Sequence, residues 1–149
     1  MSVSINDEIE ELYQRLIATW NKRDAKGMAD LYSGQGVQIG FDGSKLVGRK
    51  EILAHLQPIF DEHQTPPFVT KIKSIRPLGV DTAILHAIAG MIPPGKEEID
   101  PNLNAHQTLV VVKKADNSLQ IELFQNTPAQ FHGRPELQEQ MTEELRQLL

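Results

Sequence analysis

The chain contains no cysteine, no run of basic residues and no hydrophobic segment long enough to cross a bilayer. Without cysteine, disulfides, thiolate metal sites and cysteine nucleophiles are all excluded. Lys and Arg are scattered and the net charge is −5, so the basic surface that binds nucleic acid or an anionic membrane is not expected. The longest uncharged segment, residues 82–95, is too short for a membrane span.

What is present is the composition of an ordinary globular protein. A chain of 149 residues with 40% hydrophobic and 23% charged content is long enough for one core and short for two. Residues 1–8 lack the basic start and apolar stretch of a secretory signal. The sequence therefore predicts a single cytoplasmic unit.

Helical spacing of apolar residues dominates the first part of the chain. It predicts a helix over residues 5–22 that begins after Ser4, and a shorter one that Asp24 caps and that ends in residues 33–36. A third helix is expected over residues 49–62, where Pro58 should bend or break the last turn. Between the second and third helices, Asp42-Gly43 predicts a tight turn joining strands 37–41 and 45–47.

Extended segments dominate the second part. Strands are expected over residues 68–78, 80–91, 103–114 and 119–127, with a loop at 92–102. An amphipathic helix is expected after Pro135, with Leu137, Met141, Leu145 and Leu148 on its apolar side. The order predicts an α+β fold in which helices come first and a meandering antiparallel sheet follows.

Polar residues lie among the apolar ones in the last two strands. A hairpin turning at Asp116-Asn117 places Val112 opposite Ile121, Val110 opposite Leu123, Thr108 opposite Gln125 and His106 opposite Thr127. The face that carries these residues is mostly aliphatic, whereas the other carries Lys113 and Glu122. We therefore assign the first face to the interior, an assignment that a slip of one residue would reverse.

The order of these elements and several short motifs resemble the SnoaL-like branch of the nuclear transport factor two-like superfamily. The resemblance covers about residues 5–132 and is carried by Trp20-Asn21 with Asp24, Asp42-Gly43 with Gly48, the strand start at residues 104–108, and Phe124 with Asn126-Thr127-Pro128. It implies a cone-like curved antiparallel sheet packed against N-terminal helices, the cystatin-like fold. It also implies a homodimer through the convex face of the sheet and a cavity on the concave face.

On this basis residues 1–132 form the cone domain. Residues 133–149 form a C-terminal helix that packs on the same domain or on a dimer partner. The sequence departs from the branch at Leu119, where Trp is common, and this should alter the shape of the pocket.

Candidate acid–base chemistry centres on His106, because an imidazole titrates near neutrality. The alternative is a histidine that serves only local hydrogen bonds. The resemblance also implies an oxyanion donor on the first helix, which makes Tyr13 a candidate, against the alternative of a boundary tyrosine. The remaining candidates for ligand contact are Asn104, Thr108, Gln125, His86, Trp20, Tyr32, Leu119, Ile121 and Leu123, although Trp20 also suits a core anchor.

No cofactor or metal is expected. His86 and His106 without a placed carboxylate are too few ligands for a metal site, and Gly34-x-Gly36 lacks the spacing of a dinucleotide motif. The catalytic aspartate common in related isomerases is missing from the predicted interior, so an enzyme would have to rely on His106, on His86, or on Asp42 folding over the cavity mouth.

The sequence thus predicts a protein that binds a small, mostly apolar molecule bearing a carbonyl or hydroxyl. Such a protein could act as a cofactor-independent isomerase, cyclase or dehydratase. The alternative is a non-catalytic dimerisation or association module whose cavity is filled by its own side chains. Ligand pockets usually begin at ~300 Å³, so a smaller interior favours the alternative.

Overall fold

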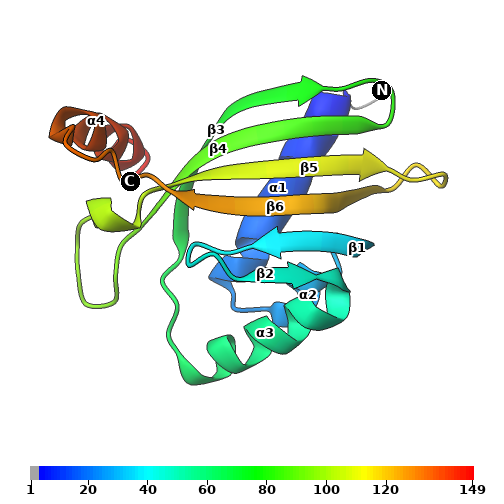
Figure 1. Cartoon of the computed structure of the whole chain (residues 1–149), viewed down its shortest axis with the longest axis horizontal. Coiled ribbons are helices and arrows are strands. Elements are labelled where there is room, and N and C mark those ends of the chain that lie inside the picture. Colours follow the sequence, from blue (N-terminus) through cyan, green and yellow to red (C-terminus); the bar gives the residue numbers. More distant parts are fainter. Residues whose placement is uncertain (1–3) are drawn as a thin grey trace.

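A computed structural model describes residues 4–149, so residues 1–3 of the predicted cone domain lie outside it. Helices at the amino-terminal end cover one face of a single sheet, and a last helix lies at one end of the sheet (Figure 1). In the described part of the chain, no helix is long and apolar enough to cross a membrane. The helices are α1 (Ile5–Asn21), α2 (Ala25–Ala29), α3 (Gly48–Glu62) and α4 (Pro135–Arg146), with a short 3-10 turn at Pro101–Leu103.

The six strands form one sheet in the order β2-β1-β6-β5-β4-β3. Neighbouring strands are antiparallel except β1 and β6, which run parallel. The predicted α+β class and cystatin-like arrangement are confirmed. The strands are β1 (Tyr32–Ile39), β2 (Lys45–Val47), β3 (Phe68–Pro77), β4 (Thr82–Met91), β5 (Ala105–Lys113) and β6 (Leu119–Pro128).

Helix α1 forms where the apolar spacing predicts it. The Ser4 hydroxyl accepts a hydrogen bond from the Asp7 N–H at 3.1 Å, which satisfies one of the unpaired donors of the first turn. Ile9, Leu12 and Leu16 are buried on the side that faces the sheet. The helix therefore contributes one continuous apolar stripe to the core.

Helix α2 is shorter than predicted. Asp24 caps it as expected, accepting from the Gly27 N–H at 2.9 Å, but it ends at Ala29. Tyr32 already belongs to β1, because the Ile121 N–H donates to the Leu31 carbonyl at 3.0 Å and starts the pairing with β6. The predicted continuation of this helix to residue 36 is wrong.

Two features lead from β1 into α3. The predicted hairpin turn at Asp42-Gly43 is present, and Gly43 has φ +90°, a conformation that suits glycine. Helix α3 then runs without interruption through Pro58 to Glu62, so it is not broken at the proline. These elements form one side of the space between helices and sheet.

One face of the sheet packs against α1, α2 and α3. Alternate residues of β5 are buried on that face, and Leu85 of β4 and Phe124 of β6 join the same core. In the orientation of Figure 1, α1 passes behind this sheet, so the face toward the viewer is the opposite one. We call the face that packs on α1–α3 the inner face and the other the outer face.

Helix α4 packs against the outer face near the ends of β3 and β4. Leu145 and Met141 of α4 form a small second core with Ile88 and Ile99. The Asn104 side-chain amide also donates to the Thr142 hydroxyl at 2.9 Å, and both residues are buried. The loop over residues 92–102 is thus tied to α4 through Ile99.

Candidate functional site

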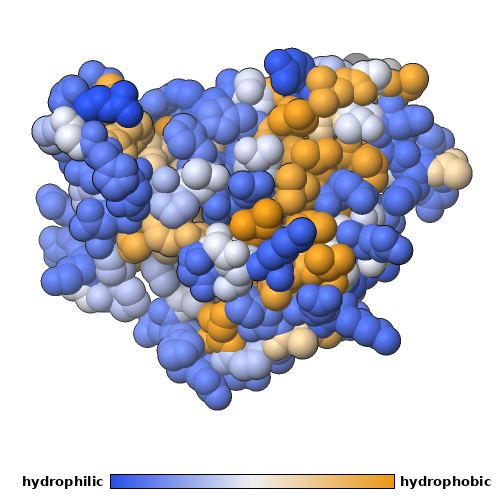
Figure 2. Space-filling model, in the orientation of Figure 1, coloured by the Kyte–Doolittle hydropathy of each residue, from blue (hydrophilic) through white to orange (hydrophobic). Residues whose placement is uncertain are grey.

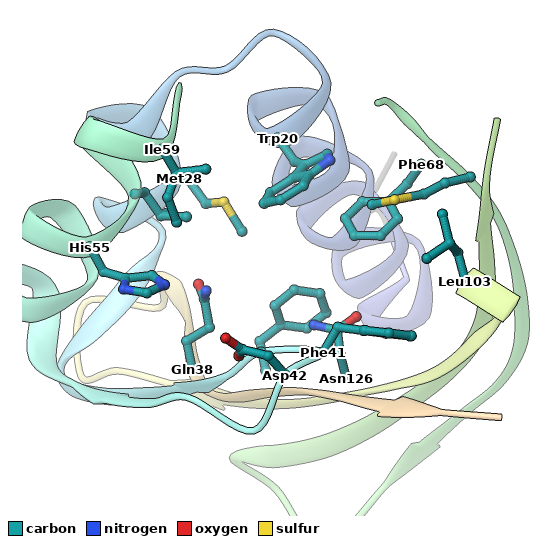
Figure 3. Close-up of a pocket in the computed structure, with 14 residues that line it drawn as sticks. Trp20, Met28, Gln38, Phe41, Asp42, His55, Ile59, Phe68, Leu103 and Asn126 are labelled. Carbon is teal, nitrogen blue, oxygen red and sulfur yellow. The ribbon is translucent and has the colours of Figure 1, made fainter. Parts of the chain in front are cut away.

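A pocket of about 260 Å³ lies between the inner face of the sheet and the helices (Figure 3). Its wall is mostly apolar and is contributed by elements from the whole chain. The volume falls just below the ~300 Å³ at which ligand pockets usually begin, so by the criterion given above it counts toward the self-filled alternative and leaves room only for a small molecule. The lining residues are Trp20, Met28, Gln38, Gly40, Phe41, Asp42, His55, Leu56, Ile59, Phe68, Met91, Leu103, Phe124 and Asn126.

Trp20 forms part of the pocket wall, as predicted, and is held rigidly. Its indole N–H donates to the Pro66 carbonyl at 3.0 Å. Its ring packs edge-on against Phe60 at 5.3 Å and tilted against Phe68 at 5.0 Å. The predicted core-anchor role and the predicted place in the cavity therefore coexist in one side chain.

Gln38 and Asn126 bring side-chain amides into this apolar wall. Both are buried, and each is hydrogen-bonded to a group behind the wall. The Tyr32 hydroxyl donates to Gln38 Oε1 at 2.9 Å, and Gln107 Nε2 donates to Asn126 Oδ1 at 2.9 Å. The polar groups of the wall are therefore fixed in place.

Asp42 and His55 lie at the rim of the pocket, together with the tip of Gln38 (Figure 3). Asp42 accepts from the backbone N–H of Ser44 at 2.9 Å and from its hydroxyl at 3.0 Å. These bonds lower the pKa of the exposed Asp42 carboxyl, and the charge of nearby His55 lowers it further. The predicted approach of Asp42 to the cavity mouth matches its position, but a carboxylate with a lowered pKa is a weak base.

His106, Thr108, Gln125 and Leu123 do not line this pocket. The predicted pairs His106–Thr127, Thr108–Gln125 and Val110–Leu123 are confirmed, but they lie on the outer face. The predicted pair Val112–Ile121 is wrong. A three-residue turn shifts the register by one, and a bulge between Val110 and Val111 shifts it back.

The reason for the reversed face is that both faces of the hairpin are aliphatic. The charged residues Lys113 and Glu122, which were used to choose the outer face, do not indicate which face is exposed to solvent. Lys113 ends β5, and Glu122 lies at the bulge, where its carboxylate accepts from the Ser33 hydroxyl at 2.7 Å. Because of the bulge, Ile121 does face inward as predicted, buried in the core, while Leu119 packs beside it and lines a separate hollow near Ile9.

Tyr13, Tyr32 and Asn104 are all buried outside the pocket lining. The Tyr13 hydroxyl donates its proton to Gln107 Oε1 at 2.5 Å inside the core. It is therefore not available to a ligand as an oxyanion donor. Asn104 lies beneath α4. These three predicted ligand contacts are corrected in position, because the Tyr13 and Tyr32 hydroxyls and the Asn104 side-chain NH₂ each donate to a partner within the fold.

His86 and His106 form a stacked pair on the outer face. Their ring centroids are 5.1 Å apart, and His86 Nε2 lies 2.9 Å from His106 Nδ1. They line a shallow hollow beside α4 with Lys73 and Glu144. Within residues 4–149 no group of three or more His, Asp or Glu side chains is arranged to hold a metal ion.

Gln38 and His55 are pocket residues that the sequence did not single out, and Asn126 was named only as part of a family motif and not as a pocket residue. His55 falls three residues after Ile52 and four before Ile59, which is the spacing of the inner side of α3. That spacing is a usable signal for His55. Gln38 and Asn126 required the correct face of the sheet, which the sequence left ambiguous.

The fold and the pocket define a small α+β protein with a cavity between a curved sheet and its amino-terminal helices. The chain belongs to the SnoaL-like domain family, whose profile matches residues 9–118. The resemblance inferred from the sequence motifs is thereby confirmed. No curated protein matched the chain.

Solved structures share the fold over most of the chain. A domain of unknown function with a cystatin-like fold from Nostoc punctiforme is 25% identical, with a TM-score of 0.81 over 99% of this chain and 98% of its own. A candidate calcium/calmodulin-dependent protein kinase type II association domain from Thiobacillus denitrificans is 16% identical, with a TM-score of 0.72 over 81% and 94%. A ketosteroid isomerase-like protein from Erwinia carotovora is 17% identical, with a TM-score of 0.65 over 80% and 92%.

Proposed function

We propose that the protein binds a small, mostly apolar molecule in the pocket between the sheet and α1–α3. The observation that carries the proposal is an open space of about 260 Å³ whose apolar wall holds two anchored amides and, at its rim, Asp42 and His55. A wall of this composition binds by apolar burial and selects through a few polar groups.

The position of the acid–base groups favours binding over turnover. Asp42 and His55 lie at the rim, whereas proton abstraction needs a base within hydrogen-bond reach of the reacting carbon. The Ser44 hydrogen bonds keep the Asp42 carboxylate weakly basic. An isomerase, cyclase or dehydratase activity of this family member would therefore depend on Asp42 and His55, and not on His106.

Native mass spectrometry of the freshly purified protein tests the proposal directly. We expect the wild-type chain to carry an added mass that denaturation releases. Leu103→Trp, which enlarges a pocket-lining side chain, should lose that mass because the new ring occupies the space. Val80→Trp is the matched control, since Val80 is 93% exposed and lies outside this pocket.

A wild-type protein without added mass, which also fails to take up small ketones or hydrocarbons offered at millimolar concentration, would contradict the binding function. Retention of the same mass by Leu103→Trp would place the ligand elsewhere. Loss of the mass in both variants would indicate general destabilisation, which a comparison of their melting temperatures would reveal.

Association is a second candidate function, favoured by the outer face of the sheet. Ile84, Val110 and Leu123 lie on this face and are half-buried in the isolated chain. Figure 2 shows a broad hydrophobic area over the strands on this side of the molecule. We propose that a second copy of the chain covers it in a homodimer, because exposed apolar patches of this kind mark interaction surfaces.

A further inference from the structure

Two buried tyrosines determine which atoms the pocket amides present to a ligand. Tyr32 is fully buried, and within residues 4–149 its hydroxyl has one hydrogen-bond partner, the Gln38 side chain. Burial raises the pKa of this phenol, so the hydroxyl keeps its proton and must donate it. The atom that accepts is Oε1, since the opposite amide orientation would leave a buried hydroxyl proton without an acceptor.

A second tyrosine acts on Asn126 through one intermediate residue. Tyr13 Oη lies 2.5 Å from Gln107 Oε1, a separation at the short limit for O–H···O and below the range for N–H···O. Gln107 therefore presents Oε1 to Tyr13 and Nε2 to Asn126, whose Oδ1 accepts at 2.9 Å. Because Asn126 Oδ1 is bound to Gln107, the Asn126 Nδ2 atom points away from Gln107.

The two amide nitrogens are left for the pocket. Gln38 pairs with Phe124 across β1 and β6, so Asn126 is its diagonal neighbour on the same face. Among the described residues, neither Gln38 Nε2 nor Asn126 Nδ2 donates to a protein atom. The two nitrogens are not among the fully buried side-chain atoms that lack a partner in that part of the chain. Those atoms are Thr65 Oγ1 and Asn104 Oδ1.

We propose that Gln38 and Asn126 form a donor pair, oriented by Tyr32 and Tyr13, that selects a small neutral ligand by an acceptor oxygen such as a ketone carbonyl. The two N–H groups bind the oxygen, and Trp20 and Phe68 cover the hydrocarbon part. Asp42 at the rim disfavours a carboxylate ligand by charge. This inference rests on the proposed binding function and adds the chemical class and the residues that choose it.

Two probes of equal shape test the inference: cyclohexanone and methylenecyclohexane, in which CH₂ replaces the carbonyl oxygen. Binding is followed by ¹⁵N–¹H NMR titration of the Trp20 indole and the Gln38 and Asn126 side-chain amides. We expect cyclohexanone to bind about tenfold more tightly, roughly the effect of one to two net hydrogen bonds. Only the ketone should shift the two amide signals strongly.

Gln38→Glu is the decisive variant, because its carboxylate still accepts from Tyr32 but offers an acceptor to the pocket. We expect it to remove the preference for the ketone and to leave methylenecyclohexane affinity within about twofold. Gln125→Glu makes the same change one residue before Asn126 but on the outer face, and should keep the preference. If Gln38→Glu does not fold, Tyr32→Phe provides the test, since it frees the amide to turn and should shrink the preference.

Equal affinity of the wild type for both probes would overturn the donor pair while the binding function stands. An unchanged ketone preference in Gln38→Glu or, failing that variant, in Tyr32→Phe would do the same. Failure of both probes to bind the wild type would overturn the donor pair and the binding function together.

Discussion

At the scale of single residues, the stacked histidines of the outer face make stability depend on pH. Burial, the neighbouring His106 and the charge of Lys73 lower the pKa of His86 below its ordinary value. Glu144 of α4 faces the same hollow but already pairs with Lys71 and Lys73. The folded chain therefore disfavours the protonated form of His86.

The sign of the effect follows from proton uptake. As pH falls below about 6.5, the unfolded chain protonates this residue before the folded chain does, so the free energy of unfolding decreases. We expect His86→Gln to lose less stability than the wild type between pH 7 and pH 5 in urea titrations. His132→Gln, which removes an exposed imidazole, should keep the wild-type slope, and parallel curves for His86→Gln and wild type would refute the effect.

The individual site residues show what the sequence could and could not give. Trp20, a predicted ligand contact, lies in the pocket wall, and Asp42, considered only as a carboxylate that could fold over the cavity mouth, lies at the rim. In the predicted register Gln107 and Asn126 share a face with Lys113 and Glu122, and that face was assigned outward because of those two charges. A buried amide partnered by a distant tyrosine, 94 residues away in the case of Gln107 and Tyr13, leaves no local pattern.

At the scale of elements, α4 depends on one side chain for its packing on the sheet. Leu145 is fully buried against Ile88 and Ile99. We expect Leu145→Ala to lower the free energy of unfolding by about 2–5 kcal/mol, the usual effect of removing a large buried side chain. Leu148→Ala, at a position 46% exposed, should change it by less than about 0.5 kcal/mol in the same urea titration.

If Leu145→Ala and Leu148→Ala lowered the free energy of unfolding by the same small amount, α4 would not pack on the outer face in solution. Gly90 supplies a structural reason to expect otherwise. A Cβ added there would lie 2.9 Å from a Leu145 methyl and 3.1 Å from Asn104 Oδ1, so α4 and the loop approach the β4 backbone closely. A helix that only rested on the surface would not make this close approach.

Element types were mostly predictable because apolar periodicity separates helix from strand over long segments. The errors fall where pairing with a distant strand decided the outcome. Tyr32 was assigned to a helix because Met28, Leu31 and Tyr32 follow helical spacing. In the structure, Tyr32 instead pairs with Ile121 of β6 as part of β1. Gly36 shows the same contact, since an added Cβ would lie 2.6 Å from the Ile121 carbonyl oxygen.

At the scale of the whole molecule, the order of helices and strands was enough to place the chain in its family. The pocket was harder to predict because its wall combines residues from Trp20 to Asn126, brought together only by the curved sheet. The outer face posed the opposite problem. Its aliphatic composition is that of an interior, and the proposed second copy of the chain would give this composition a physical reason.

A homodimer through the outer face has a specific consequence for charge substitutions. In a two-fold symmetric interface each substitution enters twice, so Leu123→Lys places two lysines in or near one apolar contact. We expect the wild type to sediment at about twice the 16.7 kDa chain mass and Leu123→Lys to sediment as a monomer. Leu78→Lys, in the exposed turn after β3, should remain dimeric.

A monomeric wild type, or equal dissociation by both variants, would exclude this face as the interface. A dimeric Leu123→Lys would move the contact away from the centre of the β5–β6 hairpin, because two unpaired lysines cannot be buried there without a large desolvation cost.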